Sequence, residues 1–121
     1  MPMRNEGFAK TFTAAGEIGA HRIVAFGDAD AEAKQAEGGS AALIGVSDEL
    51  GAEEAGEPID VILDGIAYVE LGGEVTRGKP VTADSDGKAV EASDGDFIVG
   101  YAMHTGTDGD LGSVRIVPSR H

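Results

Sequence analysis

The sequence contains no cysteine and no tryptophan, few basic residues and no long hydrophobic run. Without cysteine, neither a disulfide framework nor a thiolate metal site can form. Its 9 lysines and arginines against 22 acidic residues give a formal net charge of −13, which argues against nucleic-acid binding, because that needs a basic surface. No apolar run approaches the roughly 20 residues of a membrane helix, and the opening MPMRNEGFAK lacks the apolar segment of a signal peptide. These absences predict a soluble protein made in the cytoplasm, without nucleic-acid or membrane partners.

Large apolar side chains are also scarce. The hydrophobic fraction is 41%, but alanine is its commonest member, and the aromatic residues are four phenylalanines and two tyrosines. Glycine occurs 19 times in 121 residues, well above the usual share of about 7%, and its spread between short apolar runs indicates many tight turns. So thin a core predicts a marginal monomer that gains stability by associating with copies of itself or with a partner.

Acidic residues are concentrated in the first half of the chain. Between Asp28 and Asp64 there are eleven acids and one base, Lys34. The basic residues near the two ends are Arg4, Lys10, Arg115 and Arg120. One interpretation is a solvated acidic face that keeps the protein soluble. The other is an acidic outer surface with basic ends that face a partner.

Strand-like alternation is the main local pattern. Apolar and polar residues alternate with a period of two over 59–63, 66–71 and 114–117. This period, with many β-branched residues, predicts strands. Two stretches could be helical, Asp28–Glu37 and Asp48–Ala55, the second behind a possible N-cap at Ser47. Neither has a wide apolar stripe, so as helices they would be short surface pieces, and 28–37 could equally be a poor strand.

An internal repeat organises the chain. Its matching segments, in the same order, are 16–25 with 73–82, 44–46 with 99–101, and 59–62 with 114–117. The offset drifts from 57 to 55 residues, as expected when loops change length and strands keep their order. The sequence therefore predicts an all-β fold, a small β-barrel or sandwich of roughly six to nine strands in two related halves. The predicted β domain covers 14–121, with halves over about 14–71 and 72–119.

Residues 1–13 lie outside this repeat and form a predicted N-terminal arm. Phe8 and Phe12 are large apolar groups in a segment with few other core-forming residues. Either they pack on the protein's own sheet, as termini often do, or the segment is an extended arm that becomes ordered on a partner.

The stretch VTADSDGKAVEA, residues 81–92, raises the question of a metal site because Asp84 and Asp86 are one residue apart. A calcium loop of the EF-hand type needs glycine at its sixth position and glutamate at its twelfth. Counted from Asp84, Gly87 comes fourth and the twelfth residue is Gly95, so the pattern fails. Asp-Gly between apolar segments instead predicts a β-hairpin with a type I′ turn. The Asp-Gly pairs at 94–95 and 108–109 predict similar turns.

No motif for catalysis is present. His21, His104 and His121 lack ligand spacing, the serines lack a nucleophile-elbow pattern, and the paired glycines lack a phosphate-binding fingerprint. We therefore predict no enzymatic activity, no catalytic residue, no metal and no cofactor. A hydrolase with a pair of carboxylates is a further alternative, because such a pair could not be singled out in so acidic a chain.

Five runs of the sequence resemble one known family. They are GIAYVELGGEVTRGKPVTAD (65–84), GKAV (87–90), IVGYA (98–102), ALIGVS (42–47) and GEPIDV (56–61). In order and spacing they are similar to the head-decoration, or capsid cement, proteins of tailed bacteriophages. The resemblance covers about residues 13–118 and rests mostly on glycines and apolar residues.

This resemblance implies a β-barrel-like homotrimer on the outer surface of the virion. There it would clamp neighbouring major capsid proteins after the shell expands, without enzymatic activity. The family often reaches the shell with an N-terminal arm, which assigns capsid binding here to Arg4, Phe8, Lys10 and Phe12. Removing residues 1–12 should then weaken shell binding and leave the fold intact. The alternative function is a virion-surface β-barrel module that binds a glycan or a host-cell surface.

Overall fold

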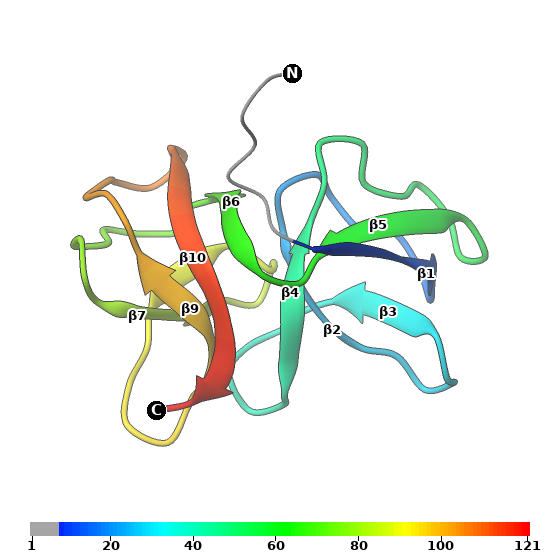
Figure 1. The fold of residues 1–121 in the computed structure, drawn as a ribbon, viewed down its shortest axis with the longest axis horizontal. Helices are drawn as coiled ribbons and strands as arrows, with labels where there is room; N and C mark the ends of the chain where they lie inside the picture. The colour runs from blue at the N-terminus through cyan, green and yellow to red at the C-terminus, as the bar shows by residue number, and fades with distance from the viewer. Residues whose placement is uncertain (1–7) are drawn as a thin grey trace.

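The computed structural model describes residues 8–121, which contain ten strands joined by loops and turns, and no helix. The first five strands are β1 (Ala9–Ala14), β2 (Ile23–Phe26), β3 (Glu32–Gln35), β4 (Leu43–Ser47) and β5 (Pro58–Ile62). They form a closed barrel in the order β1-β3-β2-β4-β5, called the first barrel below (Figure 1). β1 closes it, because this strand pairs antiparallel with β5 on one side and parallel with β3 on the other.

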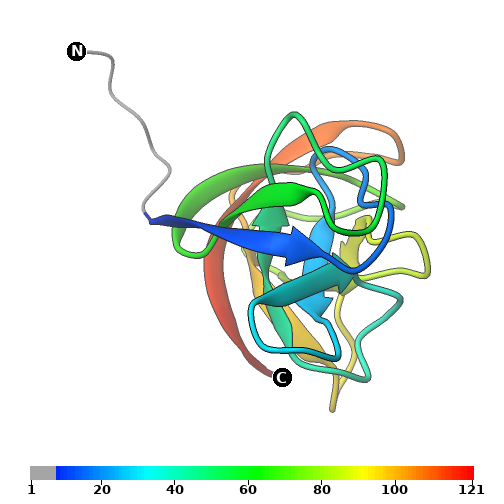
Figure 2. The same ribbon diagram turned by 90° about the vertical axis from the view of Figure 1, so that its right-hand side faces the viewer.

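The other five strands form a second sheet beside the first barrel. They are β6 (Gly65–Glu70), β7 (Pro80–Ala83), β8 (Ala89–Glu91), β9 (Phe97–Ala102) and β10 (Leu111–Arg120). Their order is β6-β10-β9-β7-β8, and an isolated parallel bridge between Leu71 and Ala89 joins the two edges. With this bridge, β6, β7, β8, β9 and β10 have the same neighbours as β1, β2, β3, β4 and β5, in that order. The first barrel lies in front of the second sheet in Figure 2. The predicted all-β fold of two related halves is confirmed.

The strand register shows which residues of the two halves correspond. Val24 of β2 lies opposite Gly45 of β4, and Val81 of β7 lies opposite Gly100 of β9. These equivalences agree with the predicted offsets of 57 and 55 residues. At both glycines a carbonyl oxygen of the neighbouring strand lies where a Cβ would be, so no side chain fits there.

The predicted match of 59–62 with 114–117 is wrong by two residues. Val61 and Val114 each lie opposite the second residue after the glycine of the neighbouring strand, so β5 and β10 are related by an offset of 53. A shift of two keeps every side chain on the same face of a strand. The alternation of apolar and polar residues therefore fits an offset of 55 as well as one of 53. Only the pairing of β5 with β4 and of β10 with β9 distinguishes the two offsets.

Two hydrophobic clusters fill the interior. One lies among β1–β5 and includes Ile18, Val24 and Val61, each at most 1% exposed. The other fills the second sheet and continues onto the first barrel through Ile23 and Val46. All five residues of β4 are buried, because its side chains supply both clusters. The two halves therefore share apolar contacts, where large-to-small substitutions typically cost about 2–5 kcal/mol.

Polar contacts also join the halves. Arg22 Nη2 donates to Glu70 Oε1 at 3.1 Å, and Lys88 Nζ lies 3.3 Å from Glu70 Oε2. The Ile23 N–H donates to the carbonyl of Gly87 at 2.7 Å. Burial raises the pKa of Glu70, but the hydrogen bond from Lys88 and the charges of Arg22 and Lys88 outweigh it, so the pKa lies below its ordinary value of 4.5. Glu70 is therefore charged at neutral pH and links a cation from each half.

Neither of the two stretches that could be helical forms a helix. Within 28–37 the strand β3 forms, which was the alternative interpretation. Residues 48–55 form an irregular connection with an isolated bridge between Ala52 and Ile18, and Asp48 Oδ1 accepts the N–H groups of Leu50 and Gly51 at 3.0 and 3.1 Å. A side chain that binds the backbone two and three residues ahead offers it an alternative to helical bonding. Among residues 8–121, no helix is long and apolar enough to cross a membrane.

Candidate functional site

Residues 81–92 form a hairpin, as predicted, since β7 and β8 pair antiparallel. Its turn type differs from the prediction. Gly87 has a φ of 76°, whereas Asp86 has no positive φ, and the Gly87 N–H donates to the Asp84 carbonyl at 3.2 Å. The connection is therefore a type I turn followed by a left-handed glycine, not a type I′ turn. Asp84 Oδ1 accepts the N–H groups of Asp86 and Lys88 at 2.8 and 2.9 Å, so this carboxylate stabilises the turn.

The other two Asp-Gly pairs also form turns. Gly95 and Gly109 have φ values of 91° and 89°. The N–H of Asp96 donates to the Ser93 carbonyl, and the same bond, three residues apart, closes the turn at 107–110. A positive φ at the third position is typical of a type II turn. These aspartates are parts of the scaffold.

The four residues assigned to capsid binding differ in their accessibility. Arg4 lies outside the described residues. Phe8 is 60% exposed, and Lys10 is exposed with its Nζ 5.7 Å from the centroid of the Phe12 ring. Phe12 itself packs against the cluster among β1–β5. Of these four residues, Phe8 and Lys10 expose their side chains to solvent, whereas Phe12 is partly buried against the core.

The predicted arm and the barrel overlap in the structure. Residues 9–13 of the predicted arm pair with β5, in a register that runs from Ala9 opposite Ile62 to Thr13 opposite Pro58. These residues close the first barrel, so we now expect that removing residues 1–12, which takes away most of β1, would disturb the fold. A truncation that tests the arm must leave β1 whole.

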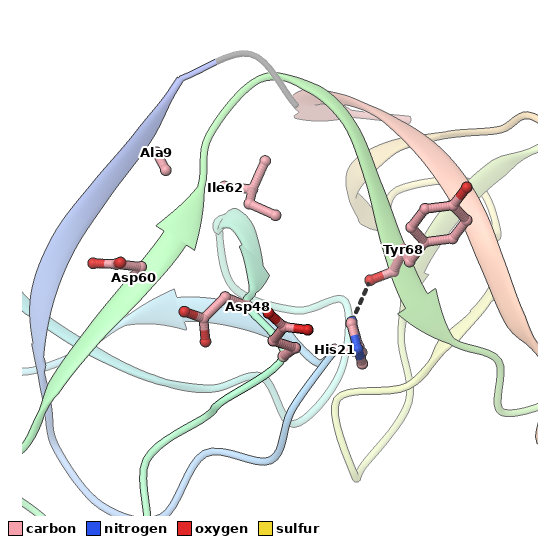
Figure 3. Close-up of a pocket in the computed structure, with 7 residues that line it drawn as sticks. Ala9, His21, Asp48, Asp60, Ile62 and Tyr68 are labelled. Atoms are coloured by element: carbon pink, nitrogen blue, oxygen red, sulfur yellow. Dashed lines mark hydrogen bonds between the residues drawn. The ribbon is translucent and has the colours of Figure 1, made fainter. Parts of the chain in front are cut away.

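A pocket of about 320 Å³ opens where β1 and β5 face β6 (Figure 3). Its lining residues are Ala9, His21, Asp48, Glu49, Asp60, Ile62 and Tyr68. His21 has a φ of 56°, and its Nδ1 lies 3.2 Å from the carbonyl oxygen of Tyr68. That left-handed backbone is uncommon for a non-glycine residue. Through this contact His21, just before β2, is joined to Tyr68 on β6.

The pocket combines negative charge with an apolar wall. Asp60 also accepts the hydroxyl of Thr11, and Asp48 caps its own turn, so both carboxylates have structural partners. Within residues 8–121, no group of three or more histidines and acids is placed to hold a metal ion. Such a lining suits the cationic end of a lysine or arginine side chain.

The three histidines lie in separate environments. His21 lines the pocket, whereas His104 Nδ1 is 2.7 Å from the Ser113 hydroxyl and His121 Nε2 is 3.4 Å from Asp94 Oδ1. They do not converge on one centre.

Comparison with known proteins identifies the family. A family model described as phage cement protein matches residues 4–117. The chain belongs to the phage cement protein family. This is a family of structural proteins associated with the phage head, not of enzymes.

A solved structure has the same fold. The crystal structure of the head fiber gp8.5 N base of bacteriophage phi29 matches with a TM-score of 0.74, covering 94% of this chain and 97% of that chain at 21% identity. At this identity the likeness shows the fold alone. No curated protein matches the sequence. The two-half architecture thus occurs in another protein of a phage head.

Sequence reasoning missed the pocket, because its lining comes from segments that meet only in the fold. Ala9 and Tyr68 are far apart in sequence, and the strand alternation that places Tyr68 outward says nothing about what lies beside it. The one available signal was the acidic stretch that contains Asp48 and Asp60.

Proposed function

We propose that this chain is a decoration protein that binds the outer surface of a phage head as a homotrimer and stabilises the expanded shell. The carrying observation is the family match over residues 4–117. The fold shared with a head-fiber base agrees with it. The proposed partner is the major capsid protein, and the chain would be made in the host cytoplasm and end on the virion surface.

The thin core supports association. Each half is built on small residues such as Ala14, Ala33, Ala67 and Ala89, so a lone copy has little apolar area to bury. Burial between copies adds to its stability. A trimer also presents three capsid contacts at once, and simultaneous contacts raise the overall affinity well beyond that of one.

The proposed capsid contact is the beginning of the chain, with Arg4, Phe8 and Lys10. Phe8 is a large apolar side chain left 60% exposed at the start of β1, and its carbonyl accepts the N–H of Leu63 at 2.7 Å. Its backbone is thus fixed to the barrel while its ring faces outward. An exposed aromatic with a neighbouring cation is a common composition at binding surfaces.

The experiment is co-sedimentation with expanded shells of the major capsid protein from the phage or prophage that encodes this chain. The intact protein should sediment with the shells, and a variant that lacks residues 1–7 should bind less while its thermal unfolding stays unchanged, because β1 is whole. The double change Phe8→Ser with Lys10→Glu should have the same effect. Lys34→Glu, on β3, serves as a charge control. Absence of binding by the intact chain contradicts the proposed function, and equal binding by the truncated chain contradicts the proposed contact.

A further inference from the structure

One face of the second sheet exposes aromatic residues and almost no charge. Tyr68 lies on β6, and Tyr101 of β9 lies opposite Arg115 of β10. Ala67 and Val114, which alternate with these residues, are 1% and 0% exposed. Since successive side chains of a strand point to opposite faces, the tyrosines and the arginine point away from the core.

This outer face consists of Ile66, Tyr68, Tyr101, Arg115 and Val117 on three adjacent strands, and of Met103 directly after β9. Tyr68 is 58% exposed, and Tyr101, Met103 and Val117 are 38–41% exposed. In Figure 1, β10 lies between β6 and β9, so that the face is continuous across them. Apolar patches shared by several strands are uncommon on the free surface of a monomer.

Charge distinguishes this face from the rest of the chain. Arg115 is its single charged member, and no acid among residues 8–121 forms an ion pair with it. Glu70, farther along β6, already binds Arg22 and Lys88. Because each copy carries a net charge of −13, a face with one cation and no free carboxylate is a place where a second acidic copy can dock with little repulsion.

The chain also carries a complement to Arg115. Tyr68 belongs both to the outer face and to the acidic pocket, where Asp48 and Asp60 lie. We infer that a second copy covers the outer face and that Arg115 of one copy enters the acidic pocket of the next. This inference rests on the proposed trimer and names its contact surfaces. The outer face and the pocket share only Tyr68, and Arg115 meets carboxylates from a different part of the surface. The contact is therefore head-to-tail, the kind that closes into a ring when the rotation permits.

The test measures oligomeric state by sedimentation equilibrium of the intact chain and of single-residue variants. Arg115→Glu should raise the concentration at which the assembly dissociates about tenfold or more, because a buried cation becomes an anion facing carboxylates. Lys34→Glu changes the net charge equally on β3, far from the face, and should leave dissociation unchanged. Thermal unfolding of each variant at a fixed low concentration checks that the fold is kept.

A charge swap tests the pairing itself. Asp60→Arg should weaken association as Arg115→Glu does, and the double variant should recover most of it. An Arg115→Glu variant that dissociates like the intact chain overturns the inference about the face. A double variant as dissociated as the single ones overturns the pairing with the pocket. A monomeric intact chain, by contrast, contradicts the trimer of the proposed function.

Discussion

The first barrel and the second sheet have one topology but differ in closure and in surface. The first barrel closes through continuous pairing of β1 with β3 and β5, whereas one bridge between Leu71 and Ala89 joins the edges of the second sheet. Eleven acids lie between residues 28 and 64, whereas the outer face of the second sheet has one charge, that of Arg115. The two halves therefore share the same backbone constraints, such as the close strand contacts at Gly45 and Gly100. Their surfaces differ in charge and in exposed aromatic residues.

The largest expected effect tests whether a shared backbone constraint acts in both halves. A Cβ on Gly45 would overlap the carbonyl oxygen of Ile62, and one on Gly100 would overlap that of Arg115. Backbone atoms cannot move aside as a flexible side chain can. We expect Gly45→Ala and Gly100→Ala each to lower the free energy of unfolding by about 3 kcal/mol or more, measured by urea denaturation.

The matched controls are the equivalent glycines Gly16 and Gly73. No heavy atom lies within 4 Å of a Cβ on Gly16, and one on Gly73 makes an ordinary contact of 3.8 Å with Val90. Alanine at either position should change stability by no more than about 0.5 kcal/mol. If Gly45→Ala and Gly100→Ala behave like these controls, the close approach of the strands is not a constraint on the fold.

The next effect concerns the hairpin that docks on the first barrel. Gly87 has a φ of 76°, and a Cβ there would lie 2.7 Å from Gln35 Cγ and 3.2 Å from the Ile23 carbonyl oxygen. Gln35 can move, but the backbone strain stays, so Gly87→Ala should cost about 1–3 kcal/mol. Thermal unfolding measures it, and a variant as stable as the parent contradicts the docked geometry.

A smaller effect depends on pH and concerns the link between the halves. Because the folded pKa of Glu70 is lowered, its ionisation stabilises the fold above the ordinary value of 4.5, and this contribution is lost as the pH falls through the folded pKa. Glu70→Gln should cost about 1 kcal/mol at pH 7 and much less at pH 3. Urea denaturation at both pH values measures it. Glu74→Gln, at an exposed carboxylate, is the control, and an equal loss at both pH values would refute the ion-pair account.

The smallest effect has the opposite sign. Ala31 lies just before β3, as Gly87 lies just before β8 in the other half. The φ of Ala31 is 65°, in the left-handed region. Glycine adopts that backbone without the cost that a Cβ imposes. Ala31→Gly should therefore stabilise the protein by up to about 1 kcal/mol, observed as a higher melting temperature. A lower melting temperature would show that Ala31 is not strained.

The sequence indicated the fold well because its signals were local. Period-two alternation predicted strands, and the glycines at 45 and 100 anchored the repeat at the correct offset. It failed where local patterns are degenerate. A shift of two residues preserves alternation, so β5 and β10 were misaligned. The acidic, alanine-rich segment at 28–37 has no clear period, so helix and strand could not be separated before β3 was seen to pair.

The candidate sites depended on contacts that only the fold provides. The family resemblance assigns Phe12 to capsid binding, but in β1 its side chain packs against the cluster among β1–β5. The sequence shows Arg115 only as a basic residue near one end, and residue spacing does not reveal the register that places it beside Tyr101. Composition predicts that the chain associates. The surfaces proposed for that association can be identified only from the strand pairing in the structure.

Heating expanded shells with and without the chain tests the central claim most directly. If the chain is a cement for the head, saturating amounts should raise the temperature at which the shells rupture, and the bound copies should number a multiple of three. Shells that rupture at the same temperature in the presence of the intact chain, at concentrations that saturate binding, would contradict the account.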